Sequence, residues 1–375
     1  MKDLCLLFLK LGTIGFGGPA AHIAMMEDEV VRRRNWISYE RFLDLLGATN
    51  LIPGPNSTEM AIHIGYLRAG WKGLLAAGAC FIFPAVSLTL VLAVLYVEYG
   101  SVPQVTPFIA GIRPAVIAVI IAAVVRLGGP VLAKRPGAYL LVAVAVLNVV
   151  GIDEILLLLG AGLAGLLWNQ RTTLFSRAAS CVALSPLAGY QLSHSLESPV
   201  QSATLAGLGF YFLKIGSILY GSGYVLAAFL QSGLVDARHW LSQSQLFDAI
   251  AIGQFTPGPV LSTATLIGYL ILGIPGASVA TIGIFAPSFV FVLLSIPFIP
   301  RLRSSARGRS FLDGVNAASL GLMLAVTVKL ASGALPDAGS WVILVCASLA
   351  ILLWNTNSAW IVAGSALAGW VISLF

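Results

Sequence analysis

The chain has 375 residues, of which 58% are hydrophobic and only 10% are charged, and its mean hydropathy is +0.93. Soluble domains carry about 25% charged residues, so this composition excludes a protein with a fully water-covered surface and predicts an all-α polytopic membrane protein. The net charge of +6 comes from Lys and Arg in short segments between apolar runs. Such residues set orientation in a membrane, so no nucleic-acid partner is expected.

In chain order, one span leads into an arginine-rich segment at 27–36, and a segment around Pro53-Gly54-Pro55 follows. The further spans of this half are predicted at about 74–97, 107–127, 137–150 and 154–168. A linker at 169–206, rich in Ser, Thr and Pro, then separates residues 1–168 from residues 207–375. The second region repeats the first, so the sequence predicts two transporter repeats joined by a polar linker.

The repeat is visible residue by residue. The pentapeptide FLKLG, residues 8–12, aligns with FLKIG, residues 212–216, and the P-G-P of 53–55 aligns with that of 257–259 at the same offset of 204. One residue is then lost, and Gly65-Tyr66 aligns with Gly268-Tyr269 at an offset of 203. Chance does not produce so long a match in register, which indicates an internal duplication.

Loop charges predict that the two repeats have opposite orientations. In the first half, segments 27–36 and 126–137 are basic and are therefore expected in the cytoplasm, whereas 97–104 has no Lys or Arg. In the second half the counterpart of that bare loop, 300–309, is strongly basic. Equivalent loops on opposite sides are typical of inverted-topology repeats, here of about five spans each.

Each P-G-P segment is predicted to be the tip of a re-entrant helical hairpin. Residues 39–66 are interrupted in the middle, so each arm reaches only about halfway across the hydrocarbon. Irregular backbone at that depth is tolerated where it is buried in protein or lines a polar cavity. Helix N-termini with hydroxyl side chains at two converging tips would form an anion site. The alternative is a proline-kinked span with no ligand.

The predicted site follows from these segments and from glycine breaks in the first span of each half. Its substrate-binding residues are Lys10, Gly17, Gly18, Pro53, Gly54, Pro55, Asn56, Ser57, Thr58, Lys214, Gly221, Ser222, Pro257, Gly258, Pro259, Ser262 and Thr263. The glycines also suit close helix packing, and Lys10 also suits a side chain that reaches to the interface. Glu59 and His63 are candidates for proton coupling because ionisable groups inside membranes are usually functional. Arg113, which aligns with Asn316, is expected near a water-filled vestibule.

No catalytic, cofactor or metal constellation is found. The sequence lacks H-E-x-x-H, G-x-S-x-G and Walker A motifs. Cys5, Cys80, Cys181 and Cys346 are isolated, which is typical of small apolar fillers and not of metal ligands. The sequence therefore predicts a protein that is not an enzyme and needs no cofactor.

The blocks FLKLGTIGFGGPAAHIAMM, LIPGPNSTEMAIHIGY and QFTPGPVLSTATLIGYL resemble the signature blocks of the chromate ion transporter family, in its long two-repeat form. The resemblance implies chromate export across the bacterial inner membrane, driven by the membrane potential or an ion gradient. An importer or exchanger of sulfate or another oxyanion is the alternative. Inverted-repeat carriers with re-entrant hairpins are often dimers, and by that analogy a homodimer is expected. The second half departs from the pattern at Tyr220-Gly-Ser-Gly and Pro259-Val-Leu, so the two half-sites are unequal.

Overall fold

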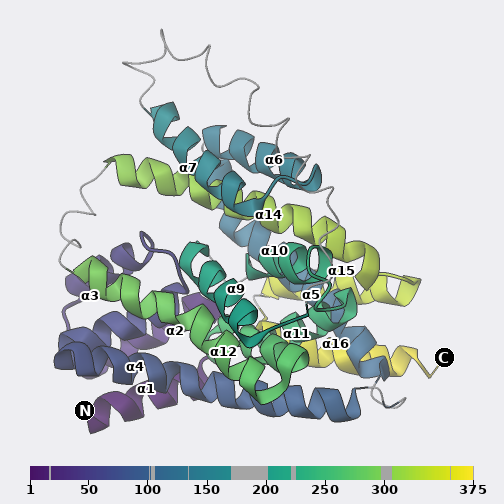
Figure 1. Cartoon of the computed structure of the whole chain (residues 1–375), viewed down its shortest axis with the longest axis horizontal. Coiled ribbons are helices and arrows are strands. Elements are labelled where there is room, and N and C mark those ends of the chain that lie inside the picture. The colour runs from purple at the N-terminus through teal and green to yellow at the C-terminus, as the bar shows by residue number, and fades with distance from the viewer. Residues whose placement is uncertain are drawn as a thin grey trace.

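The computed structural model describes all residues except 17, 101, 103–105, 134, 170–201, 221–224, 297–305, 355 and 375. Every regular element in the described residues is helical, and none is a strand (Figure 1). Most of the predicted linker at 169–206 lies outside the described residues, as do the candidate site residues Gly17, Gly221 and Ser222.

The helices follow the same order in both halves. The first half contains α1 (Lys2–Ile14), α2 (Gly18–Glu27), a π-helical turn (Asp28–Arg33), α3 (Tyr39–Thr49), α4 (Asn56–Tyr99), α5 (Thr106–Leu132), α6 (Arg135–Val149) and α7 (Glu154–Asn169). The second contains α9 (Leu205–Ile218), α10 (Leu226–Leu230), a π-helical turn (Gln231–Asp236), α11 (Gln243–Phe255), a 3-10 turn (Val260–Ser262), α12 (Thr263–Ser295), α14 (Ala306–Ala334), α15 (Ala338–Trp354) and α16 (Ser358–Ile372).

The structure agrees with a multi-pass membrane protein. Four of the described helices are long and apolar enough to cross a membrane: Asn56–Tyr99, Pro107–Gly129, Val260–Ser295 and Gly308–Ala331. Large apolar side chains such as Phe83 and Ile282 stand on their outer surfaces, 63% and 68% exposed. Exposure of this kind is costly in water and favourable against lipid.

Helix α4 is two helical arms that run antiparallel. Ala69 and Gly70 leave the helical conformation, and Gly70 has a φ of 59°, which glycine adopts without strain. A methyl group added to Gly65 would collide with the carbonyl oxygen of Gly73. Residues eight apart in a straight helix are separated by about 12 Å, so this contact requires the chain to reverse.

Helix α12 reverses in the same way. Leu272 and Gly273 are non-helical, Gly273 has a φ of 64°, and Gly268 lies directly against Gly276. The glycines at these positions let the two arms touch backbone to backbone.

The helix before each P-G-P begins with a side-chain cap. Ser38 accepts a hydrogen bond from the N–H of Arg41 at the start of α3. Ser242, at the equivalent position, forms a capping box with Gln245 at the start of α11. Both helices then stop before the prolines, since α3 ends at Thr49 and α11 ends at Phe255.

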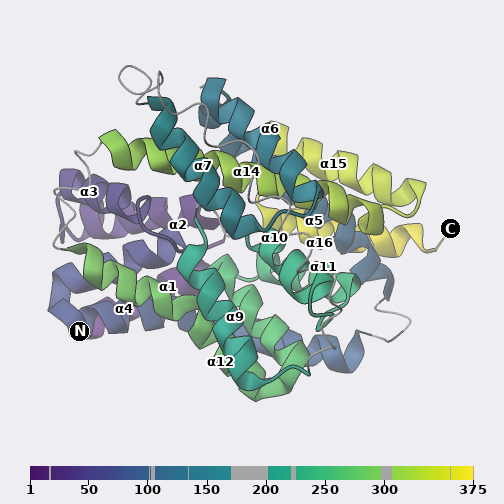
Figure 2. The same ribbon diagram turned by 45° about the horizontal axis from the view of Figure 1, so that its top comes forward.

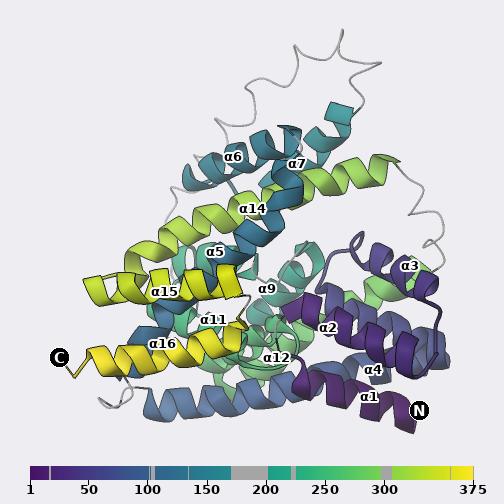
Figure 3. The same cartoon turned by 180° about the vertical axis from the view of Figure 1, so that it is seen from behind.

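The two halves interlock. Helix α5 packs on α15 and α16 of the second half, and its counterpart α14 packs on α6 and α7 of the first half (Figure 2). Helix α12 packs on both α9 and α4. Seen from behind, α1, α2 and α3 gather at one end of the molecule and α15 and α16 at the other (Figure 3). The candidate site lies between these two ends, where residues of α2, α5, α14 and the start of α16 surround a cavity.

Candidate functional site

Each P-G-P tip is tied to the broken first helix of the opposite half. The N–H of Gly54 donates to the carbonyl of Leu219 at 2.7 Å, and the N–H of Gly258 donates to the carbonyl of Gly15 at 2.8 Å. These two bonds are repeat equivalents, because both pairs of residues are related by the offset of 204. Proline has no N–H, and the N–H of the glycine in each tip is used in these bonds. The next backbone donors lie at the start of the helix that follows the tip.

The hydroxyl groups beside the two tips differ in their contacts. Ser57 and Thr58 are buried at the start of α4, and the hydroxyl of Thr58 has no hydrogen-bond partner. At the second tip, Ser262 accepts a hydrogen bond from Thr89 at 3.2 Å, and Thr263 donates to the carbonyl of Val260 at 2.8 Å. The hydroxyls of the second tip are therefore used within the protein.

Glu59 lies under the first tip and is completely buried. Neither of its carboxyl oxygens has a hydrogen-bond partner, and the hydroxyl of Ser288, from α12, has none either. Both groups face Gly54, because a methyl group there would collide with Oε1 of Glu59 and lie 2.8 Å from Oγ of Ser288. His63, one turn further along α4, is also buried, with Nε2 unpartnered.

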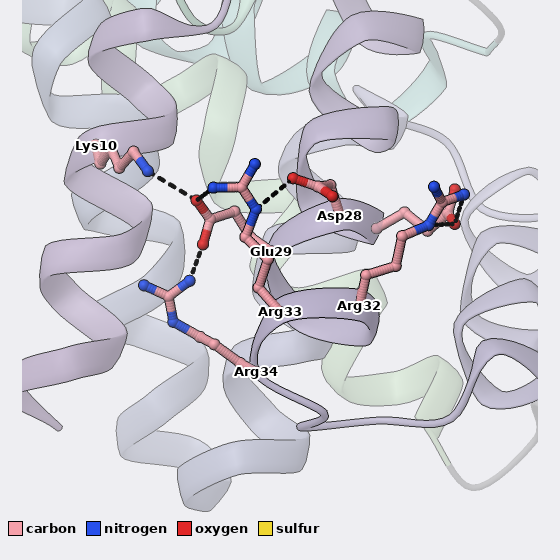
Figure 4. Close-up of polar contacts among 7 residues, drawn as sticks. Lys10, Asp28, Glu29, Arg32, Arg33 and Arg34 are labelled. Atoms are coloured by element: carbon pink, nitrogen blue, oxygen red, sulfur yellow. Dashed lines mark hydrogen bonds and ion pairs between the residues drawn. The ribbon is translucent and has the colours of Figure 1, made fainter.

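The two candidate lysines do not join the P-G-P tips. Nζ of Lys10 lies 2.7 Å from Oε1 of Glu29, and that carboxylate also pairs with Arg33 and Arg34 (Figure 4). The charge of Lys10 is therefore balanced by a buried carboxylate in this structure. Lys214 is exposed on α9.

A cavity of about 1250 Å³ lies between the two halves. Its walls come from α2, the first P-G-P segment, α5, α6, α14 and the start of α16. The polar residues among those that line it include Asn50, Asn56, Arg126, Arg309, Asn316 and Asn357. Asn56 donates from Nδ2 to Oδ1 of Asn50 at 2.6 Å across the tip. Of the predicted substrate-binding residues in the described part of the chain, Asn56 lines this cavity.

The repeat counterpart of this cavity is nearly closed. A pocket of about 10 Å³ is lined by residues that include Ile120, Ala227, Gln254 and Val260. Their repeat equivalents in the large cavity are Met323, Ile23, Asn50 and Asn56. Equivalent residues of the two halves are therefore separated at the large cavity and close together at the small pocket.

A polar cluster joins three helices on the closed side. Nε of Arg113, on α5, lies 3.2 Å from Oδ1 of Asp248, on α11, and the hydroxyl of Tyr96, on α4, donates to Oδ2 of Asp248 at 2.7 Å. Asp248 is buried. Sequence reasoning placed Arg113 near a vestibule, whereas its repeat partner Asn316 lines the cavity. Asp248, which aligns with Asp44 at the offset of 204, is not among the residues that the sequence predicted for the site.

The remaining predicted residues shape the tips. Pro55, Pro257, Gly258 and Pro259 are buried, Pro53 is half-buried, and Gly18 begins α2 beside the cavity. The candidate site therefore has two parts: an open polar cavity at the first tip, and a buried carboxyl group directly behind that tip.

Comparisons of the sequence with known proteins point to one family of transporters. The family model described as chromate transporter matches residues 2–166 and again residues 206–370. The chain is 31% identical to a chromate transport protein of Cupriavidus metallidurans, over 99% of this chain and 93% of the relative. It is also 31% identical to a chromate transport protein of Pseudomonas aeruginosa, over 97% and 91%. An uncharacterised transporter of Methanocaldococcus jannaschii is 26% identical over 88% and 84%. No solved structure matches the chain.

Proposed function

Because the chain belongs to the chromate transporter family, whose members are transporters and not enzymes, we propose that it exports chromate across the bacterial inner membrane by alternating access. In this proposal the two halves are inverted repeats, each P-G-P segment is the tip of a re-entrant hairpin, and the dianion binds in the large cavity. The proposal therefore specifies direction, site and mechanism for the family's transport of chromate.

The observation that carries the proposal is the inequality of two repeat-related spaces. Four of the eight residues that line the space of about 10 Å³ have repeat equivalents that line the space of about 1250 Å³. If the halves exchanged conformations, the open space would close and the closed one would open. Alternating access in inverted-repeat carriers works through such an exchange.

Helix packing supports the same reading. Helix α11 packs on α5 and α16, on the closed side. Its counterpart α3 has no comparable packing on α14 or α7 in the described part of the chain. The ion pair between Arg113 and Asp248 joins α5 to α11 and is mostly shielded from solvent, since the arginine side chain is 29% exposed and the aspartate side chain 4% exposed. We assign this pair as the closed gate.

The charges near the cavity favour a cytoplasmic opening. Arg126 begins the basic segment 126–137 and Arg309 ends the basic segment 300–309. Both line the cavity, and basic segments face the cytoplasm. An exporter must collect its substrate on that side.

The cavity offers donors suited to a tetrahedral dianion. Asn56 supplies a side-chain amide at the N-terminus of α4, where unpaired N–H groups and the helix dipole favour negative charge. Arg126 donates to the carbonyl of Ile351 at 2.7 Å, and a guanidinium carries five N–H donors in all. Hydrogen bonds from these groups to a dianion would be charge-assisted, and such bonds are among the stronger ones in proteins.

Outward movement of a dianion can be driven by the membrane potential. A negative charge leaving an inside-negative cell gains about 2.3 kcal/mol per charge for each 100 mV. Two charges double that figure, so export requires neither ATP nor, in principle, a second ion.

The test is chromate uptake by everted membrane vesicles, in which the cytoplasmic face is outward. With a lumen-positive potential and no pH gradient, we expect radiolabelled chromate to accumulate and excess sulfate, a dianion of the same shape, to inhibit it. Arg126→Gln should lower the initial rate at low chromate by about tenfold or more, the effect of losing a charged hydrogen bond of about 1.5 kcal/mol. Arg32→Gln, at a side chain 71% exposed and outside the cavity, is the matched control.

Absence of potential-driven accumulation in vesicles that contain the folded protein would contradict export. Sulfate uptake driven by a proton gradient, with no movement of chromate, would assign the same site to another oxyanion.

A further inference from the structure

We propose that Glu59, with Ser288 beside it, is a proton-binding site, and that proton binding there is linked to dianion binding in the neighbouring cavity. The identity of the anion rests on the proposed function, but the proton site rests on the geometry behind the first P-G-P tip.

The first argument is the state of the carboxyl group. Glu59 has no exposed surface, and both of its oxygens lack hydrogen-bond partners. The hydroxyls of Thr58 and Ser288 are also buried and unpartnered. An isolated carboxylate is very costly in such a place, so the group is stable only when it carries a proton or meets a cation.

The second argument is that the fold does not require an acid there. At the second tip, Thr263 occupies the position equivalent to Glu59, and Ala85 occupies the position equivalent to Ser288. Gly258 packs against Ala85 as Gly54 packs against Glu59 and Ser288. A small hydroxyl and a methyl group therefore suffice to support a tip, and the acid of the first tip needs another explanation.

The ligand is a proton rather than a metal ion. One carboxylate and two hydroxyls are too few for calcium or magnesium, which take six or more oxygen ligands. The described residues contain no cluster of three acidic, histidine or cysteine side chains that could hold a metal. A proton needs only the carboxyl group itself.

Other titratable groups surround Glu59 on several elements. Tyr220, which follows α9, is close enough to interact electrostatically with Glu59. His63 lies one turn along the same arm of α4, and Arg41, on α3, interacts electrostatically with it. The unpartnered Nε2 of His63 provides a second proton acceptor between Glu59 and the end of that arm.

The link to the anion follows from position. Asn56 lines the cavity and precedes Glu59 by three residues, a rise of about 4.5 Å along the helix. A dianion held at Asn56 would repel an ionised Glu59, so the carboxyl group should take up a proton as the anion binds. By reciprocity, a protonated Glu59 should raise the affinity for the anion.

The experiment compares purified wild-type protein with Glu59→Gln, which mimics the protonated acid. Sulfate is the probe because it does not titrate near neutral pH, unlike chromate. At a pH where Glu59 is partly ionised, we expect the wild type to take up protons from weakly buffered solution when sulfate is added, and its affinity to fall as pH rises further, by up to about tenfold per pH unit for one linked proton. Glu59→Gln should bind sulfate with little pH dependence and no proton uptake.

Glu98→Gln is the matched control, because it makes the same change on an exposed residue of α4. A second readout does not depend on any anion: the infrared carbonyl band of a protonated carboxylic acid should be present in the wild type and in Glu98→Gln but absent in Glu59→Gln. Should the variant misfold, this band in the wild type and its response to sulfate still decide the matter.

Two outcomes would overturn the proposal. One is a wild-type spectrum with no protonated acid band at neutral pH, with or without sulfate. The other is a band that sulfate and pH leave unchanged together with sulfate binding that does not depend on pH, because Glu59 would then be only a buried structural acid. The vesicle experiment measures direction and driving force, so it can fail while this one succeeds, and the reverse.

Discussion

At the scale of single residues, Glu29 shows how a buried charge is tolerated in a membrane protein. Its side chain is 8% exposed, yet Lys10, Arg33 and Arg34 all reach its two oxygens (Figure 4). The three cations come from α1 and from the end of the π-helical turn. A buried carboxylate with several charged donors is compensated, in contrast to Glu59, which has none. In our proposal the two glutamates therefore have different roles: Glu29 stabilises the fold and Glu59 binds a proton.

We expect Glu29→Gln to destabilise the protein by about 2 kcal/mol or more, because charged hydrogen bonds are lost and partly buried cations remain. Asp28→Asn is the control: Asp28 pairs with Arg33 but is 43% exposed, so its loss should cost less than about 1 kcal/mol. Thermal unfolding in detergent measures both. Equal midpoints for the two variants would contradict the structural role of Glu29.

At the scale of elements, the P-G-P tips are held by a reciprocal exchange of hydrogen bonds between the halves. Gly54 and Gly258 each donate to a carbonyl of the other half's broken first helix. The tips are thus fixed, while the helices that precede them differ in their packing. Helix α11 packs on α5 and α16, whereas α3 has no comparable packing on α14 or α7 in the described residues. Movement of these arms against the long helices α5 and α14 would exchange the open and closed spaces.

Cysteine labelling tests this exchange. In a protein whose native cysteines have been replaced, Asn56→Cys lies in the open cavity and Val260→Cys in the closed pocket. We expect a membrane-impermeant maleimide to label the first from the cytoplasmic side and the second poorly from either side. Adding Asp248→Asn removes the carboxylate that pairs with Arg113 and should raise labelling of Val260→Cys from the outer side several-fold, because breaking a buried pair favours the open gate.

Asp3→Asn, on an exposed residue of α1, is the control for that substitution. Unchanged protection of Val260→Cys in the Asp248→Asn background would mean that the ion pair does not hold the pocket closed.

At the scale of the whole molecule, the proposal requires that the halves face opposite ways. Lys72 and Pro275 occupy equivalent positions, related by the offset of 203, at the reversals of α4 and α12, and both are exposed. Lys72→Cys should be labelled only from the cytoplasm and Pro275→Cys only from outside in intact cells, because the basic segment around Lys72 is retained inside. Labelling of both from one side would rule out inverted repeats.

The helical, multi-pass character of the chain, its family and the places where helices break could all be predicted from the sequence. Apolar runs, proline and glycine determine where helices span and break through their own local chemistry, and this effect does not depend on which distant residues they contact in the fold. The sequence did not predict that Lys10 and Arg113 pair with Glu29 and Asp248, which lie 19 and 135 residues away along the chain. Which charge is compensated depends on packing.

The sequence by itself therefore determined the repeat, the breaks at Pro53-Gly54-Pro55 and Pro257-Gly258-Pro259, and the kind of residues beside them. Only the tertiary structure decided that Glu59 is buried without a partner and that one of two equivalent spaces is open and the other closed. The physical reason is that burial and the opening of a space depend on how residues far apart in the chain pack together, which local chemistry does not determine.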